Sequence, residues 1–384
     1  MTASRFPAAE TLMDEASASL GLTDFGAGDF KANLQRFLES VEREGMLTEA
    51  ASAQVLALCR RRLANRLEIE AWYAAHPEAS AAEVGPVASI TGLPRTGTTA
   101  LVNVMSQDDQ FRPLRNWEQD RPCPPPVLGE EADDPRRLAA LAGLERLRRE
   151  HPEMAAMHLS DVDATEEDVE ILGLSFQAQQ YAMPIFSYHA WWREADLRPA
   201  FAYHRRVLRL LQSRRPPNRW LIKAPAHAFH LDALVAAYPD VRIVVTHRDP
   251  AKAVPSAISI VASLQARAGK VDYEMIGRNA AEHFRISAER AMAARARLGE
   301  ARFFDLQHTE FVADPMGSLK RVYDFLGLDL TRETRAKMQA WHAANRSGAH
   351  GTHRYTAEQF GLSADQLRSD FRAYIERYDV PLER

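Results

Sequence analysis

Residues 92–99 read Gly92-Leu93-Pro94-Arg95-Thr96-Gly97-Thr98-Thr99 and follow the apolar run Val87-Ala88-Ser89-Ile90. The next six residues, Ala100-Leu101-Val102-Asn103-Val104-Met105, continue as a helical pattern. A glycine-containing turn between a strand and a helix N-terminus can cradle phosphate, because backbone N–H groups and the helix dipole converge there. The segment therefore predicts a phosphate-binding loop. The alternative is an ordinary strand-turn-helix in which glycine and proline only make the turn.

The loop differs from the nucleoside triphosphatase pattern G-x-x-x-x-G-K-[ST] at one decisive position. Both glycines and the final hydroxyl residue match, but Thr98 replaces the lysine. Because that lysine reaches the β and γ phosphates, its absence counts against ATP or GTP hydrolysis. Arg95 supplies a cation inside the loop instead, and it can hold phosphate oxygens bidentately.

Short apolar runs alternate with helical patterns along the rest of the chain. Strands are expected at residues 87–90, 112–116, 219–222, 241–246 and 302–306. Helices are expected at residues 98–105, 230–238, 255–264 and 277–298. This alternation predicts an α/β fold of the P-loop type, with a central parallel sheet of about five strands between two helical layers. Ligands of such sheets bind at the carboxyl ends of the strands.

The domain organisation follows from the same patterns. Residues 1–82 form a helical N-terminal region without strand signals, and residues 83–384 form the α/β domain. An insertion at about residues 123–218 carries its own helices, and we expect it to lie beside the active site. Its large apolar residues indicate either a pocket for a lipophilic alcohol or ordinary core. They are Phe176, Tyr181, Met183, Pro184, Phe186, Tyr188, Trp191 and Trp192.

The amino-acid composition argues against several classes of protein. The 384 residues include 48 Lys+Arg and 52 Asp+Glu, a net charge of -4, so nucleic acid is a poor partner. Two cysteines cannot form a disulfide framework, and the first 19 residues lack the apolar run of a signal peptide. Without an apolar stretch of roughly 18 residues, no membrane span is expected. We expect a soluble cytoplasmic protein, and a homo-oligomer is compatible with the sequence.

The loop resembles a known family. Leu93-Pro94-Arg95-Thr96-Gly97-Thr98-Thr99 is similar to the 5′-phosphosulfate loop of sulfotransferases that use 3′-phosphoadenosine 5′-phosphosulfate (PAPS). The similarity is greatest to protein-tyrosine sulfotransferases and to the broad bacterial group, and it assigns Pro94, Arg95, Thr96, Gly97, Thr98 and Thr99 to donor binding. Cytosolic enzymes carry a tryptophan that stacks on adenine where this chain has Ala100. The sequence does not say what packs against adenine here.

A second segment matches the same family. The strand at 241–246 leads into His247-Arg248-Asp249-Pro250, and Ser256 follows Arg248 by eight positions (256 − 248 = 8). In the family an arginine and a serine at this spacing hold the 3′-phosphate. The alternative is that Arg248 has only a structural role, as the ion-pair partner of Asp249. Arg354 lies in a late basic stretch that resembles the family's nucleotide-closing loop, and a solvated polar loop is the alternative there.

The resemblance also suggests catalytic residues. Arg95 and Lys223 are the candidates for stabilising the sulfuryl group and its leaving phosphate, since Lys223 ends the third expected strand. Glu118 resembles the catalytic glutamate of tyrosine sulfotransferases, whereas His227 is the rival base by analogy with the cytosolic enzymes. The acidic run Thr165-Glu166-Glu167-Asp168 is interpreted as a helix-capping box rather than a metal site.

These features predict transfer of a sulfuryl group from PAPS to a hydroxyl or amine of a small acceptor, which releases adenosine 3′,5′-bisphosphate. The acceptor is a small molecule, with a lipophilic alcohol as one option, and no metal is required. The alternatives are a P-loop small-molecule kinase and a non-catalytic nucleotide-binding protein.

Overall fold

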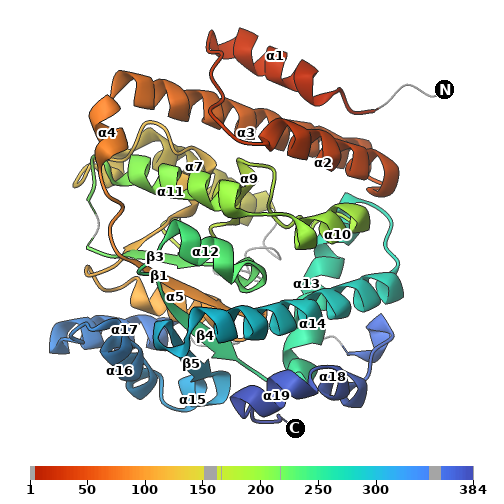
Figure 1. Cartoon of the computed structure of the whole chain (residues 1–384), viewed down its shortest axis with the longest axis vertical. Coiled ribbons are helices and arrows are strands. Elements are labelled where there is room, and N and C mark those ends of the chain that lie inside the picture. Colours follow the sequence, from red (N-terminus) through yellow and green to blue (C-terminus); the bar gives the residue numbers. More distant parts are fainter. Residues whose placement is uncertain (1–4, 151–161, 166, 217, 346–355, 384) are drawn as a thin grey trace.

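The structure is a computed structural model that describes residues 5–150, 162–165, 167–216, 218–345 and 356–383. Five parallel strands form one sheet in the order β2-β3-β1-β4-β5 (Figure 1). They are β1 (Val87–Gly92), β2 (Arg112–Pro113), β3 (Trp220–Lys223), β4 (Arg242–His247) and β5 (Phe303–Gln307). The expected P-loop-type parallel sheet is confirmed. The second strand is shorter than expected, because helix α6 (Asn116–Asp120) already begins at Asn116.

Helices cover both faces of the sheet. The helices of these layers and of the C-terminal part are α5 (Thr98–Met105), α11 (Arg198–Gln212), α12 (Leu231–Ala237), α13 (Pro250–Ala268), α14 (Tyr273–Leu298), α15 (His308–Ala313), α16 (Pro315–Leu326), α17 (Arg332–Ala344), α18 (Ala364–Asp370) and α19 (Arg372–Tyr378). On one face Ala88, Ile90 and Val244 belong to a buried cluster with α5 and the α15–α17 region. On the other face Val87 and Ile222 pack into a second cluster with α11 and α12. Successive side chains of a strand point to opposite faces of the sheet, so a buried strand packs against helices on both faces. The result is three layers: helices, sheet and helices.

The N-terminal region is helical, as expected, and lies at one end of the molecule (Figure 1). Its helices are α1 (Ala9–Leu20), α2 (Phe30–Glu44), α3 (Glu49–Ala75) and α4 (Pro77–Ala81). Leu34 and Phe37 of α2 join the same buried cluster as the sheet residues Val87 and Ile222. A shared core ties these helices to the sheet, and a domain boundary near residue 82 stays a prediction.

The segment 123–218 contributes helices and core. Its described elements include α7 (Pro135–Glu150), α9 (Val169–Gly173), α10 (Phe186–Glu194) and α11. Phe176, Tyr188 and Trp192 are almost fully buried, and the Tyr188 ring meets Phe37 edge to face at 5.5 Å. These aromatic residues fill the core between the segment and α2, so the pocket interpretation does not hold for them.

Strand register places three predicted site segments at one edge of the sheet. Ile90 of β1 pairs with Lys223 of β3, and Gly92 pairs with Thr246 of β4. Because the strands are parallel, the phosphate loop, Lys223 and Arg248 all leave the sheet at its carboxyl edge.

Three histidines pack with aromatic rings between α10, α12 and α14: His283 is buried, and His189 and His230 are half-buried. The His283 ring lies 4.4 Å from Phe229, and His230 meets Trp192 edge to face at 4.6 Å. Burial lowers the pKa of His189 to about 4 and that of His230 to about 3, and it lowers the pKa of His283 well below its ordinary value. These rings are therefore neutral in the folded protein near pH 7.

We expect the protein to lose stability as pH falls from 7 to 5.5. An unfolded histidine gains a proton near pH 6.5, whereas these three gain one only well below that value, so acid favours the unfolded chain. Each histidine contributes a loss of about 1 kcal/mol over this interval, or about 3 kcal/mol together. Urea unfolding at both pH values measures the difference. A free energy of unfolding that is the same at pH 7 and pH 5.5 would contradict the assignment of these histidines as neutral.

Candidate active site

Two glycines shape the phosphate loop. Gly92 approaches β4 so closely that a Cβ atom there would lie 2.4 Å from the Thr246 carbonyl oxygen. Gly97 caps α5 with a φ of 98°, a backbone conformation that other residues rarely adopt. Arg95 adopts a positive φ of 67° without being glycine, which is uncommon and marks a fixed loop. The two glycines are thus required by the backbone path of the loop.

The threonines of the loop differ in solvent exposure and in the groups that they contact. Thr96 is buried, and its hydroxyl lies 2.7 Å from the Leu93 carbonyl oxygen and 2.5 Å from the Thr246 hydroxyl. Thr98 is also buried at the start of α5, whereas Thr99 is exposed. Thr96 therefore holds the loop against β4, and Thr99 is the threonine whose side chain faces the cavity described below.

The structure brings the two predicted phosphate sites together. Arg95 Nε donates a hydrogen bond to Ser256 Oγ at 3.1 Å, although 161 residues separate them in the chain. Arg248 Nη1 donates to the Arg95 carbonyl oxygen at 3.2 Å. The loop, the end of β4 and the buried Ser256 of α13 thus form one connected cationic region. Arg248 also forms a bidentate ion pair with Glu383 near the end of the chain.

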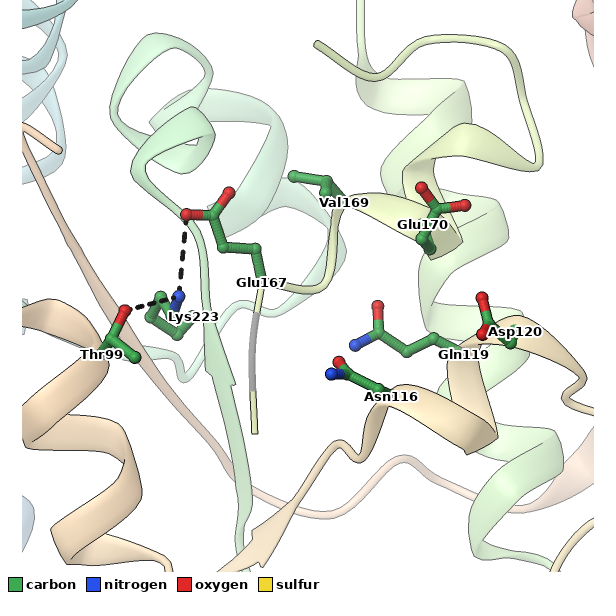
Figure 2. A pocket seen from close by; sticks show the side chains of 8 residues that line it. All are labelled: Thr99, Asn116, Gln119, Asp120, Glu167, Val169, Glu170 and Lys223. Atoms are coloured by element: carbon green, nitrogen blue, oxygen red, sulfur yellow. Dashed lines mark hydrogen bonds and ion pairs between the residues drawn. The ribbon is translucent and has the colours of Figure 1, made fainter. Parts of the chain in front are cut away.

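Lys223 lies beside a cavity of about 410 Å³ next to the loop (Figure 2). Its side chain is only 2% exposed, and its Nζ donates to Thr99 Oγ1 at 3.3 Å and lies 3.7 Å from Glu167 Oε1. The cavity lining is mostly polar or charged. It consists of Thr99, Asn116, Gln119, Asp120, Glu167, Val169, Glu170 and Lys223. A buried cation, a hydroxyl and a carboxylate therefore meet in one hollow at the carboxyl edge of the sheet.

Two glutamates of the cavity differ in their partners. Glu170 accepts hydrogen bonds from Arg61 and Arg62 of α3. Burial alone would raise the pKa of Glu170, but these arginines hold it below its ordinary value. Glu167 instead faces Lys223 and keeps about a third of its side chain exposed. The charge of Glu170 is thus balanced by its arginine partners, and Asp120 of the same lining pairs with Arg61 at 3.0 Å. Glu167, which faces Lys223, is a carboxylate that can accept a proton.

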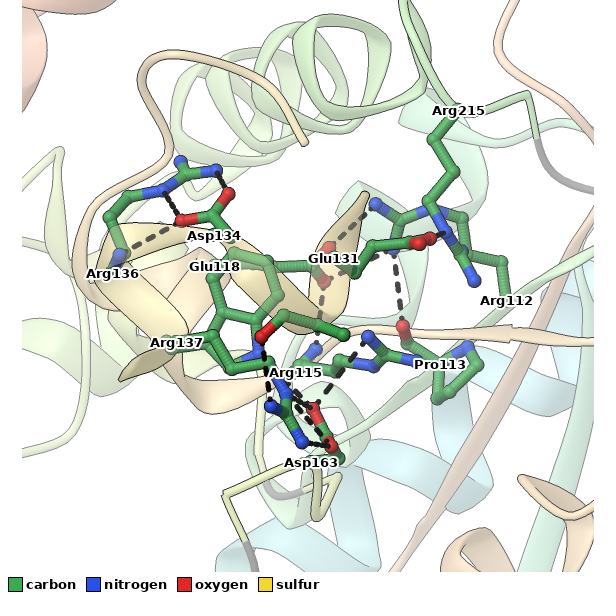
Figure 3. Close-up of polar contacts among 12 residues, drawn as sticks. Arg112, Pro113, Arg115, Glu118, Glu131, Asp134, Arg136, Arg137, Asp163 and Arg215 are labelled. Carbon is green, nitrogen blue, oxygen red and sulfur yellow. Dashed lines mark hydrogen bonds and ion pairs between the residues drawn. The ribbon is translucent and has the colours of Figure 1, made fainter. Parts of the chain in front are cut away.

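Glu118 does not take the place expected of a base. It lies in α6 and accepts two hydrogen bonds from Arg112, at 2.8 and 3.1 Å, and one from the Arg115 backbone N–H at 3.1 Å (Figure 3). Its side chain is 1% exposed, and it is not among the described residues that line the cavity, although Asn116 and Gln119 are. Both carboxylate oxygens are occupied inside the protein. This geometry favours a structural role for Glu118, as the cap of α6 and the partner of Arg112.

His227 is fully buried in a chain of polar groups. Its Nδ1 lies 3.0 Å from Ser89 Oγ, and its Nε2 lies 3.0 Å from Asp168 Oδ1. Both ring nitrogens therefore have neighbours in the interior. His227 is not among the described residues that line the cavity, so its geometry favours a role in holding other residues rather than the role of base.

Asp168 is the centre of this polar chain. Its second oxygen lies 3.1 Å from His204 Nε2, and His204 Nδ1 lies 2.6 Å from the Tyr238 hydroxyl. Burial alone would raise the pKa of Asp168, but His227 and His204 hold it well below its ordinary value. The Asp168 backbone N–H donates to the Lys223 carbonyl oxygen at 3.1 Å. Asp168 thus fixes the position of its neighbour Glu167 relative to β3.

Comparison with known proteins identifies the family. The sequence model described as the sulfotransferase family matches residues 86–332, more than half of the chain. The chain belongs to the sulfotransferase family. The matched range contains the loop, the cavity residues, Arg248 and Ser256.

The sulfotransferase is similar to several mycobacterial enzymes. It superimposes on the crystal structure of sulfotransferase STF9 from Mycobacterium avium with a TM-score of 0.91 and 29% identity, covering 99% of this chain and 98% of that one. The crystal structure of STF1 from Mycobacterium tuberculosis H37Rv gives a TM-score of 0.84 and 28% identity, covering 95% and 98%. Curated relatives are the omega-hydroxy-beta-dihydromenaquinone-9 sulfotransferases Stf3 of Mycobacterium bovis and Mycobacterium tuberculosis, each 24% identical over 110 residues. The match covers 28% of this chain and spans 28% of the length of these relatives.

Sequence reasoning missed two residues of the sulfotransferase site. Glu167 and Asp168 belong to the run interpreted as a capping box, but the Asp168 side chain makes no cap hydrogen bond to α9. Glu167 and Asp168 could have been predicted only from their proximity to Lys223 at the end of a strand, and that proximity is visible only in the folded structure. Arg354 lies outside the described residues.

Two further findings concern the described part of the sulfotransferase. No group of three or more His, Cys, Asp or Glu residues there is arranged to hold a metal ion. No described helix has both the length and the apolar character that crossing a membrane requires.

Proposed function

We propose that the protein transfers the sulfuryl group of PAPS to a hydroxyl or amine of a small-molecule acceptor and releases adenosine 3′,5′-bisphosphate. The observation that carries this proposal is the hydrogen-bonded connection between the phosphate loop and Arg248. A donor with phosphates at both ends of its ribose needs two cationic sites at a fixed separation. The loop amides suit the 5′ end, and Arg248 with Ser256, to which Arg95 Nε donates, suits the 3′ end.

The cavity residues suit the chemical step. In an in-line transfer the acceptor oxygen forms a bond to sulfur, and the bond from sulfur to the bridging phosphate oxygen breaks. The electron pair stays on the 5′-phosphate, where the charge of Lys223 stabilises it. The proton of the acceptor passes to the Glu167 carboxylate, which faces Lys223 at 3.7 Å.

The acceptor side of the site is the segment 123–218. Glu167, Val169 and Glu170 come from this segment and line the cavity opposite Lys223. Their arrangement supports the proposal that the insertion receives the acceptor. The lipophilic acceptors suggested by its aromatic residues have less support, because Val169 is the apolar member of the described lining.

Binding of nucleotides tests the donor. Adenosine 3′,5′-bisphosphate is expected to raise the melting temperature without metal, and more than ATP with Mg²⁺ does. In isothermal titration calorimetry, Arg248→Ala is expected to weaken bisphosphate binding about 10- to 100-fold, since charge-assisted contacts are lost, and to change binding of adenosine 5′-monophosphate less than about threefold. Equal losses for both nucleotides would contradict the 3′-phosphate assignment. Stabilisation by ATP with Mg²⁺ alone would favour a kinase.

A further inference from the structure

The end of the chain contacts the proposed donor site. Arg248 Nε donates to Glu383 Oε1 at 2.8 Å, and Arg248 Nη2 donates to Glu383 Oε2 at 3.0 Å. Both side chains are about three-quarters buried, with exposed fractions of 24% and 22%. A fork-to-fork pair of this kind fixes the plane of the guanidinium as well as its position.

The remaining donors of Arg248 face elsewhere. A guanidinium has five N–H groups, of which Glu383 takes the Nε hydrogen and one on Nη2. The Arg95 carbonyl oxygen takes one on Nη1 at 3.2 Å. One hydrogen on each terminal nitrogen is left, and within the described residues neither has a further hydrogen-bond partner. These two donors, one on Nη1 and one on Nη2, match two oxygens of one phosphate.

Glu383 is itself held by two residues next to the site. Its backbone N–H donates to Asp249 Oδ2 at 2.9 Å, and its carbonyl oxygen accepts from Arg368 Nη2 at 2.7 Å. The Asp249 side chain is fully buried and also accepts from Arg368 at 2.7 Å. Three residues earlier, Val380 packs in a buried cluster with Tyr374. Glu383 is therefore part of the fixed scaffold behind Arg248.

We propose that Glu383 is a positioning residue for the donor: it orients Arg248 so that the terminal edge of the guanidinium meets the 3′-phosphate. This inference rests on the proposed function. Glu383 binds the side edge of the guanidinium and leaves the terminal edge to the ligand, so it does not occupy the place of the phosphate. The positive charge of Arg248 lies between the two anionic groups and screens their repulsion. Glu383 thereby contributes to selectivity for a 3′-phosphorylated nucleotide.

Calorimetry on the full chain tests this role with two nucleotides. Glu383→Gln is expected to weaken binding of adenosine 3′,5′-bisphosphate about tenfold and to change binding of adenosine 5′-monophosphate less than twofold. Glu383→Asp keeps the charge but shortens the side chain, and it is expected to reduce the same selectivity. Glu376→Gln is the matched control, because Glu376 is exposed on α19 and lies outside this network. The control is expected to bind both nucleotides as the unsubstituted chain does.

The ratio of the two affinities separates the outcomes. If Glu383→Gln causes a general loss of structure, binding of both nucleotides will weaken together, and this result would overturn the inference. Unchanged or tighter bisphosphate binding by Glu383→Gln would also overturn it, and tighter binding would show that Glu383 competes with the phosphate. If Arg248→Ala loses bisphosphate selectivity while Glu383→Gln keeps it, the proposed function stands and only this inference fails. If the unsubstituted chain does not bind the bisphosphate, the proposed function fails and the inference with it.

Discussion

Glu167→Gln is expected to slow turnover by about 10²- to 10⁴-fold, the usual contribution of a general base. The amide cannot accept the acceptor proton, but it has nearly the same shape as the carboxylate. The dissociation constant of adenosine 3′,5′-bisphosphate is therefore expected to stay within about twofold of the unsubstituted value, and the free energy of unfolding within about 1 kcal/mol. Initial rates with PAPS and an accepted acceptor measure the loss. Full turnover in this variant would exclude Glu167 as the base.

Glu118→Gln is the matched comparison, because it makes the same change at the carboxylate first expected to be the base. Glu118 pairs with Arg112 in the interior, so the substitution leaves a buried guanidinium without its counter-charge. Removing one partner of such a pair costs about 3 kcal/mol of folding free energy or more. We expect reduced stability in urea and turnover per folded molecule near the unsubstituted value. Loss of turnover with unchanged stability would return the role of base to Glu118.

Lys223→Ala is expected to lower kcat by about 10²- to 10³-fold, the effect of removing one group that stabilises developing charge. The buried ammonium faces the cavity between Thr99 and Glu167, so its charge acts where the phosphate leaves. Binding of the bisphosphate product is expected to weaken less than kcat falls, because the charge develops only during transfer. Rates at saturating donor, together with product-binding calorimetry, separate the two effects.

Lys31→Ala is the control for Lys223→Ala. Lys31 lies on α2 and forms an exposed ion pair with Glu10, away from the carboxyl edge of the sheet. Its removal is expected to leave kcat unchanged and to affect stability by less than about 1 kcal/mol. If Lys223→Ala behaves like Lys31→Ala, Lys223 takes no part in the chemical step.

The fold was predictable where the signals are local. A buried strand, a glycine turn and a helix follow one another at residues 87–105, and this order fixes the loop without long-range information. The spacing of Arg248 and Ser256 is local as well, since a strand end and the first turns of one helix contain both. The boundary of β2 was missed because Arg115 and Glu118 start a short helix through a capping interaction.

The carboxylate that we propose as the base was not predictable from spacing. Glu118 and Glu167 both belong to short acidic stretches near expected element ends, and the sequence does not show which one has a buried arginine partner. The pairing of His227 with Ser89 and Asp168 joins three separate elements, with 138 residues between His227 and Ser89. The contact of Arg248 with Glu383 spans 135 residues. Such contacts depend on tertiary packing, which local patterns do not encode.

We propose that the phosphate loop and Arg248 bind opposite ends of one donor. A crystal structure of the full chain with adenosine 3′,5′-bisphosphate tests it most directly. The 5′-phosphate is predicted to lie on the backbone amides of residues 94–99, and the 3′-phosphate within hydrogen-bonding distance of Arg248 and Ser256. A nucleotide bound elsewhere, or one whose 3′-phosphate contacts only solvent, would contradict the claim.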